Sequence, residues 1–223
     1  MKVKVVTNIL KANTRIAEEN RRVLHERGIT TINLMSSPGA GKTTLLARTI
    51  RDLGAKIRFG VIEGDIQGTH DAEVIAALGV PVIQINTAGG CHLDANMVQS
   101  VLSELPLADL DLLVIENVGN LVCPAEFDLG EDAKVMLLAI TEGDDKPLKY
   151  PRMFRECEAL LVNKVDLAPH LEVSLEKIRA DASGLNPALQ VFEVSARSGQ
   201  GLEMWYAWLF EKLRHSDSDA LSN

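Results

Sequence analysis

The chain has 223 residues, of which 46% are hydrophobic and 24% are charged, a composition typical of a soluble globular protein with one core. Its formal net charge of −8, with acids spread along the whole length, repels nucleic-acid phosphates and anionic membrane surfaces alike. With no signal-peptide pattern and no run of about 18 apolar residues, we expect a cytoplasmic protein with no nucleic-acid and no membrane partner.

An amphipathic helix is predicted near the N-terminus, over residues 8–27. Ile9, Ile16 and Val23 recur at seven-residue spacing there, with Leu10, Ala17 and Leu24 beside them, and charged residues cover the opposite side. Gly28 follows at the position where glycine often ends a helix. Two interpretations stay open, because the apolar stripe could pack onto the same domain or onto a partner chain.

Short apolar runs alternate with helical patterns along the rest of the chain. Continuous runs of this kind suit parallel strands that helices cover on both faces. We therefore expect an α/β fold with a mostly parallel sheet of about seven strands flanked by helices. The expected strands are residues 31–35, 57–62, 80–85, 112–116, 135–140, 159–163 and 189–194.

The C-terminal part of the pattern sets the expected domain limits. A last helix at about 201–213 carries Trp205 and Trp208 on its apolar face, where we expect them in the core. We expect a single domain over residues 1–215 and a polar, disordered tail over 216–223.

A phosphate-binding loop follows the first expected strand. Residues 36–44 read Ser-Ser-Pro-Gly-Ala-Gly-Lys-Thr-Thr and lead into a helix, which is the context that a P-loop requires, although Ser36 stands where glycine is usual. Backbone N–H groups and the helix dipole attract phosphates there, and Lys42 supplies a catalytic positive charge. The expected nucleotide-binding residues are Ser37, Pro38, Gly39, Ala40, Gly41, Lys42, Thr43 and Thr44.

Acidic residues at two strand ends are candidates for holding Mg²⁺. Asp65 follows the second strand and Glu116 ends the fourth, and the Thr43 hydroxyl can complete the site. Gly119 can bring a backbone N–H to the γ-phosphate. Because Asn120 stands where a water-orienting glutamine is usual, we expect slow hydrolysis, and we take Asp65 and Glu116 as catalytic candidates.

A second loop indicates that the base is guanine. Asn163, Lys164 and Asp166 follow a strand as Asn-Lys-x-Asp, in which the carboxylate can accept from N1–H and the exocyclic amine of guanine. The Lys164 stem can cover the base plane. Further on, Ser195, Ala196 and Arg197 end another strand, and the N–H of Ala196 could meet guanine O6.

Two thiols and an imidazole form a candidate transition-metal site. Cys91 and His92 follow the third strand and Cys123 follows the fourth, so all three leave the same edge of the sheet. Nitrogen and sulfur ligands suit Ni²⁺ or Zn²⁺, with a fourth ligand from water or a second chain. Spacing alone does not exclude the alternative that these thiols are unrelated and bind no metal. We expect Cys157 to pack in the core.

These motifs closely resemble the hydrogenase nickel-incorporation GTPases (HypB), P-loop GTPases of the SIMIBI class, over nearly the whole chain. The most specific pieces are Gly-Gly-Cys-His-Leu-Asp at 89–94 and Glu-Asn-Val-Gly-Asn-Leu-Val-Cys-Pro at 116–124. The resemblance implies that Cys91, His92 and Cys123 bind nickel or zinc at a homodimer interface. It also implies GTP hydrolysis coupled to nickel delivery into the [NiFe]-hydrogenase large subunit, with a HypA-like zinc accessory protein as partner.

The chain departs from that family at its N-terminus, and two other functions compete. Some members carry an N-terminal cysteine motif and a histidine-rich tract, whereas His25 is the one histidine before the P-loop, so we do not expect nickel storage. A urease-type nickel-delivery GTPase would carry a Cys-Pro-His triplet, which the sequence lacks. A regulatory GTPase that recruits an effector, with incidental thiols, is the alternative from another class.

Overall fold

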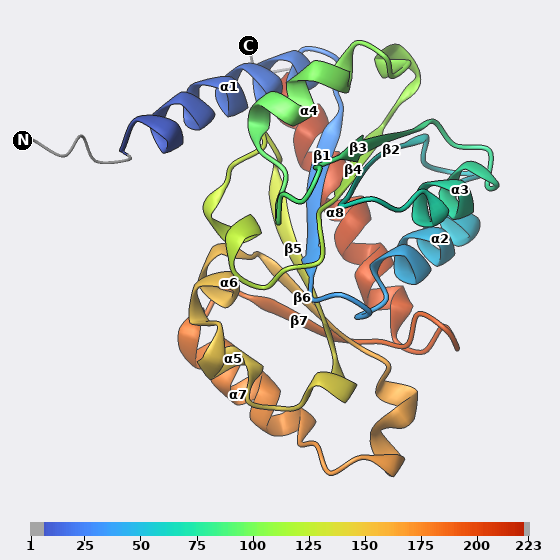
Figure 1. Ribbon diagram of the computed structural model, residues 1–223. Helices are drawn as coiled ribbons and strands as arrows, with labels where there is room; N and C mark the ends of the chain where they lie inside the picture. The colour runs from blue at the N-terminus through green and yellow to red at the C-terminus, as the bar shows by residue number, and fades with distance from the viewer. Residues whose placement is uncertain (1–6, 221–223) are drawn as a thin grey trace, which may run out of the picture.

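Seven parallel strands form one sheet in the computed structural model, which describes residues 7–220 (Figure 1). The strand order is β3-β2-β4-β1-β5-β6-β7, and every neighbouring pair is parallel. The strands are β1 Thr30–Ser36, β2 Phe59–Asp65, β3 Val82–Asn86, β4 Leu112–Glu116, β5 Ala133–Ala139, β6 Ala159–Asn163 and β7 Gln190–Glu193. Each overlaps one of the seven apolar runs of the sequence, so the expected fold class is confirmed.

Helices connect the strands and cover both faces of the sheet (Figure 1). The α-helices are α1 Thr7–His25, α2 Lys42–Leu53, α3 His70–Ala76, α4 Ala95–Leu102, α5 Lys146–Lys149, α6 Pro151–Glu156, α7 Leu175–Leu185 and α8 Leu202–Ala220. Four short 3₁₀ turns are η1 Leu107–Asp109, η2 Cys123–Glu126, η3 Ile140–Glu142 and η4 Val165–His170. No helix among the described residues is long and apolar enough to cross a membrane.

The core lies in layers between the helices and the sheet. On one face, α2, α3 and α8 pack against the strands, and the indole rings of Trp205 and Trp208 are buried there, as expected. On the other face, α4 and the end of α1 cover the β2–β4 part of the sheet, while α6 and α7 cover β5 and β6. Because helices cover both faces, most strand residues are apolar.

Helix α1 packs onto its own domain, beside α4 (Figure 1). The expected apolar stripe is buried only in part: Ala17 and Leu24 are buried, whereas Ile16 and Val23 are partly buried and Leu10 is exposed. Two polar residues, Asn13 and Asn20, complete the buried face. Gly28 has a φ of +68° just beyond the helix, as the sequence predicted.

Helix α8 continues to Ala220, beyond residue 213, where we expected the last helix to end. Residues 216–220 therefore belong to this helix, and the expectation of a disordered polar tail is wrong for them. Residues 221–223 lie outside the described part of the chain.

Candidate functional site

The P-loop leaves the end of β1 and enters α2, as the sequence predicted. Lys42 Nζ lies 3.2 Å from Ser36 Oγ, so the side chain folds back over the loop. Helix α2 begins at Lys42, six residues after the carboxyl end of β1. The free N–H groups of its first turn are therefore available to phosphates at this edge of the sheet.

Two buried carboxylates lie opposite the P-loop. Glu63 on β2 and Glu116 on β4 are direct neighbours in the strand register, and only 3% and 1% of their surfaces are exposed. The Thr43 hydroxyl donates to Glu116 Oε1 at 2.9 Å. Glu63, Glu116 and Asp71 of α3 each offer a carboxylate oxygen, and these oxygens lie within 4.8 Å of one another.

This carboxylate group fits a divalent cation. Burial, and then the charge of Glu116, raise the pKa of Glu63 to about 10, and burial also raises the pKa of Glu116. Oε2 of each residue is buried and accepts no hydrogen bond from the described residues. Unpaired buried carboxylate oxygens are costly, and Mg²⁺ would compensate them because it prefers oxygen ligands.

Asp65, which we expected in this group, lies outside it. Asp65 is the last residue of β2, and its carboxylate accepts hydrogen bonds from the backbone N–H groups of Ile66, at 2.5 Å, and Gly68, at 3.0 Å, in the exposed loop that follows. The carboxylate group contains Glu63 and Asp71 instead. Glu63 also belongs to β2, and its cross-strand pairing with Glu116 buries it.

The loop after β4 touches the P-loop directly. A Cβ atom on Gly119 would lie 3.0 Å from both the backbone N and the Cα of Pro38, so a side chain here would press on the P-loop backbone. The N–H of Asn120 donates to the carbonyl of Ser36 at 2.7 Å. A phosphate in the P-loop would therefore lie against the same loop that carries Cys123.

The expected guanine-binding loops meet beside the P-loop. The buried amide of Asn163 donates to the carbonyl of Ala40 at 2.9 Å and accepts from the N–H of Ala196 at 3.0 Å. That N–H, which we expected to meet guanine O6, is thus paired with Asn163 in this structure. Lys164 has a φ of +64°, and its Nζ donates to the carbonyl of Gly39 at 2.8 Å.

The expected base-reading residue, Asp166, is accessible to a ligand. It is the second residue of η4 and is half-buried, while Ser195 is buried and Arg197 is exposed. The Asn163 bridge therefore holds the Asp166 loop and the Ser195–Arg197 loop together, next to the phosphate site.

The three expected transition-metal ligands come together in space. One ligand atom from each of Cys91, His92 and Cys123 lies within 4.8 Å of the others. Cys91 Sγ is 3.6 Å from His92 Nδ1, and a hydrogen bond between the two thiols raises the pKa of Cys123. Cys157 is buried in the core, away from the group, as expected.

His92 is held in a partly apolar environment. Its ring stacks on Phe127 with 3.9 Å between the ring centroids. Burial lowers its pKa, which favours the neutral imidazole that binds metal ions. Two thiols and a neutral imidazole suit borderline-soft ions such as Ni²⁺ and Zn²⁺.

Three features define a P-loop GTPase: a P-loop at the end of β1, buried carboxylates opposite it and an Asn-Lys-x-Asp loop beside it. A family model described as "CobW/HypB/UreG, nucleotide-binding domain" matches residues 30–193. The chain is 53% identical over 207 residues to hydrogenase maturation factor HypB of Azotobacter vinelandii, covering 93% of this chain and 68% of that protein. The chain belongs to the CobW/HypB/UreG family and, within it, to the HypB proteins.

Two solved HypB structures share the fold. The crystal structure of the Archaeoglobus fulgidus protein matches with a TM-score of 0.86 and 41% identity, over 92% of this chain and 100% of that chain. The structure of Helicobacter pylori HypB in complex with nickel also has a TM-score of 0.86, with 37% identity over 92% of this chain and 96% of that one.

Proposed function

We propose that this protein binds and hydrolyses GTP and uses the cycle to deliver nickel during [NiFe]-hydrogenase maturation. The observation that carries the proposal is the single loop that joins both sites. Gly119 lies against Pro38 of the P-loop, and Cys123, four residues further on, lies beside Cys91 and His92. Nucleotide chemistry and metal binding thus share one segment of chain.

Each side chain of the nucleotide site has a distinct part in the proposal. Lys42 neutralises charge on the β- and γ-phosphates, and Asp166 reads the guanine edge. Thr43, Glu116 and Glu63 would hold Mg²⁺, which supplies further positive charge at the phosphates when bound. Asp65 remains a candidate for orienting water from the end of β2.

Nickel is the cargo in this proposal, and Cys91, His92 and Cys123 are its ligands, with Zn²⁺ as an alternative occupant. Three ligands leave a four-coordinate shell incomplete, so we propose that a homodimer, linked by nucleotide or metal, completes it. Val122, next to Cys123, is 56% exposed and adds apolar surface at this edge. The further partners are a HypA-like zinc accessory protein and the hydrogenase large subunit.

Nickel titration tests the cargo site directly. Wild-type protein should bind Ni²⁺ with a thiolate-to-nickel charge-transfer absorption, and Cys91→Ala should lose that band. Cys157→Ala is the matched control, because it removes a buried thiol outside the site and should leave the band unchanged. Equal nickel binding by wild-type and Cys91→Ala would favour the regulatory GTPase with incidental thiols.

Restoration of hydrogenase activity tests the delivery step. In cells that lack their own HypB protein, the wild-type chain should restore hydrogenase activity at limiting nickel, and both Lys42→Ala and Cys91→Ala should fail. Restoration of urease activity alone would favour the urease-type alternative.

A further inference from the structure

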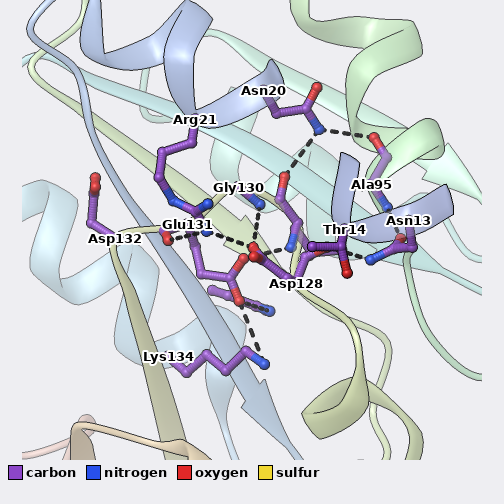
Figure 2. A network of polar contacts seen from close by, with 12 residues as sticks. Asn13, Thr14, Asn20, Arg21, Ala95, Asp128, Gly130, Glu131, Asp132 and Lys134 are labelled. Atoms are coloured by element: carbon purple, nitrogen blue, oxygen red, sulfur yellow. Dashed lines mark hydrogen bonds and ion pairs between the residues drawn. The ribbon is translucent and has the colours of Figure 1, made fainter. Parts of the chain in front are cut away.

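Two asparagines on the buried face of α1 are not explained by packing. Asn13 and Asn20 are seven residues apart, so they lie on the same side of the helix, and both are buried. Figure 2 shows both amides pointing from α1 toward two segments that are far apart in the sequence.

Each asparagine bridges those two segments. Asn20 Nδ2 donates to the carbonyls of Ala95, at 2.9 Å, and Leu129, at 3.0 Å. Asn13 Oδ1 accepts from the N–H of Ala95 at 2.8 Å, and its Nδ2 donates to the carbonyl of Asp128 at 2.8 Å. One side of each bridge is therefore Ala95, and the other is the segment 128–129 (Figure 2).

The bridged residues end the two loops that carry the metal ligands. Ala95 comes three residues after His92, and Asp128 comes five residues after Cys123. Phe127, the neighbour of Asp128, stacks on the His92 ring. The positions of these anchors therefore influence both the distance between the ligand loops and the orientation of the imidazole.

Other contacts attach the second loop to the same helix. Arg21 pairs with Asp128 at 2.7 Å. Gly130 lies so close to α1 that an added Cβ would be 2.8 Å from the carbonyl oxygen of Ala17 and 2.7 Å from the Cβ of Asn20. The backbone of this segment thus rests directly on the helix.

The stability of the fold alone does not explain why an asparagine stands at position 20, on the buried face of α1. Its Oδ1 is buried and has no hydrogen-bond partner among the described residues, which is destabilising. Ala17 and Leu24, on the same face, show that apolar residues suit the contact with the domain. A buried amide with an unpaired oxygen is better explained by the two carbonyls that it joins.

We propose that Asn13 and Asn20 are positioning residues for the transition-metal site, and that α1 holds the Cys91–His92 loop and the Cys123 loop at the separation that one ion requires. The inference rests on the proposed function of Cys91, His92 and Cys123 as nickel ligands. It adds a role for the N-terminal helix, which contributes no ligand itself.

Nickel affinity measured by chelator competition tests the proposal on the full chain. Asn13→Ala and Asn20→Ala should each weaken Ni²⁺ binding about 10-fold, as is typical for residues that orient metal ligands, and should alter the thiolate-to-nickel absorption. GTP affinity should stay within about two-fold. Leu24→Ala, which leaves a cavity on the same face of α1 but removes no bridge, is the matched control.

The outcomes separate this inference from the proposed function. If Cys91→Ala loses nickel binding while both asparagine variants bind it as wild type, the positioning role is overturned. If Leu24→Ala lowers the unfolding midpoint and weakens nickel binding as much as Asn20→Ala does, general stability explains the effect and the role is also overturned. If Cys91→Ala binds nickel normally, the proposed cargo site itself fails. Should Asn20→Ala not fold, Asn13→Ala decides alone, because it lies about two helical turns nearer the N-terminal end of α1.

Discussion

Lys42 is the residue on which phosphate chemistry depends most. Its Nζ lies over the P-loop, 3.2 Å from Ser36 Oγ, where it would face the transferring phosphoryl group. Lys42→Ala should therefore lower the turnover number for GTP at least 100-fold, since such electrostatic contributions are worth about 3 kcal/mol or more. The measurement is phosphate release at saturating GTP, with Lys56→Ala, an exposed lysine on the connection to β2, as the control. Near-wild-type turnover by Lys42→Ala would remove this lysine from the mechanism.

Asp166 should decide which base is bound. In Asp166→Asn, the new amide can donate to the C2 carbonyl of xanthine, whereas the carboxylate could only accept from guanine. We expect GTP affinity to fall and xanthosine triphosphate affinity to rise, with a reversed preference in competition binding. Glu172→Gln, an exposed acid nearby in the chain, should change neither affinity. Unchanged GTP affinity in Asp166→Asn would mean that this carboxylate does not read the base.

Glu63 should make the stability of the metal-free protein depend on pH. Its pKa is about 10 in the folded chain against an ordinary value of 4.5, so the folded state binds the proton more tightly than the unfolded state does. The stabilisation from this bound proton is complete below about pH 4.5. It is lost progressively as the pH rises from there to about 10. In EDTA, the free energy of unfolding should fall between pH 6 and 8 by up to about 1 kcal/mol per pH unit. Glu63→Gln should reduce this slope in urea titrations, and an equal slope in both proteins would contradict the shifted pKa.

The carboxylate pair also shows how far a sequence can predict a site. The P-loop, the Asn-Lys-x-Asp loop and the thiol group could be predicted because each carries its chemistry within a short stretch, or at the ends of successive strands. Glu63 could not, because its importance comes from the register that places it beside Glu116. Asp65, nearer the strand end, was the natural choice without that register.

At the scale of elements, α1 shows the same limit. Charge and apolar spacing predicted the helix and two of its buried residues, Ala17 and Leu24, but not the two asparagines of the buried face. Asn13 and Asn20 lie on that face because backbone carbonyls and an N–H group of distant loops satisfy their amides. Hydrophobic periodicity detects apolar partners only, so such a face is not visible in the sequence.

The contact between α1 and the segment after η2 should be highly sensitive to one added methyl group. Gly130 has a φ of +96°, and its Cβ would clash with the backbone of α1. Gly130→Ala should therefore lower the free energy of unfolding by about 2 kcal/mol or more. Gly28→Ala is the matched control, because Gly28 also has a positive φ, of +68°, but meets no atom within 4 Å. We expect it to cost only about 1 kcal/mol in urea titrations, and equal losses in the two variants would contradict the clash.

At the scale of the whole molecule, the strand order brings the sites together. Apolar runs predicted parallel strands, but only the order β3-β2-β4-β1 shows that β4 lies between β2 and the P-loop strand. The loop after β4 consequently contacts the P-loop through Gly119 and the loop after β3 through Cys123. A sequence does not contain this order in any local pattern, because non-local pairing decides it.

This arrangement predicts that nucleotide and metal binding are coupled through a homodimer. A γ-phosphate arriving beside Gly119 would shift its loop, and Cys123, four residues along, would move relative to Cys91 and His92. If a second chain completes the metal shell, the GTP form must favour or disfavour that dimer. Linkage is reciprocal, so metal should change GTP affinity by the same factor by which GTP changes metal affinity, about 5- to 150-fold for typical coupling. Ni²⁺ and Zn²⁺ titrations of the GDP form and the GTP-analogue form, with mass followed by light scattering, measure both effects. Cys157→Ala should couple as the wild type does, whereas identical metal affinities and identical masses in the two nucleotide states would refute the coupling even if each site binds its own ligand.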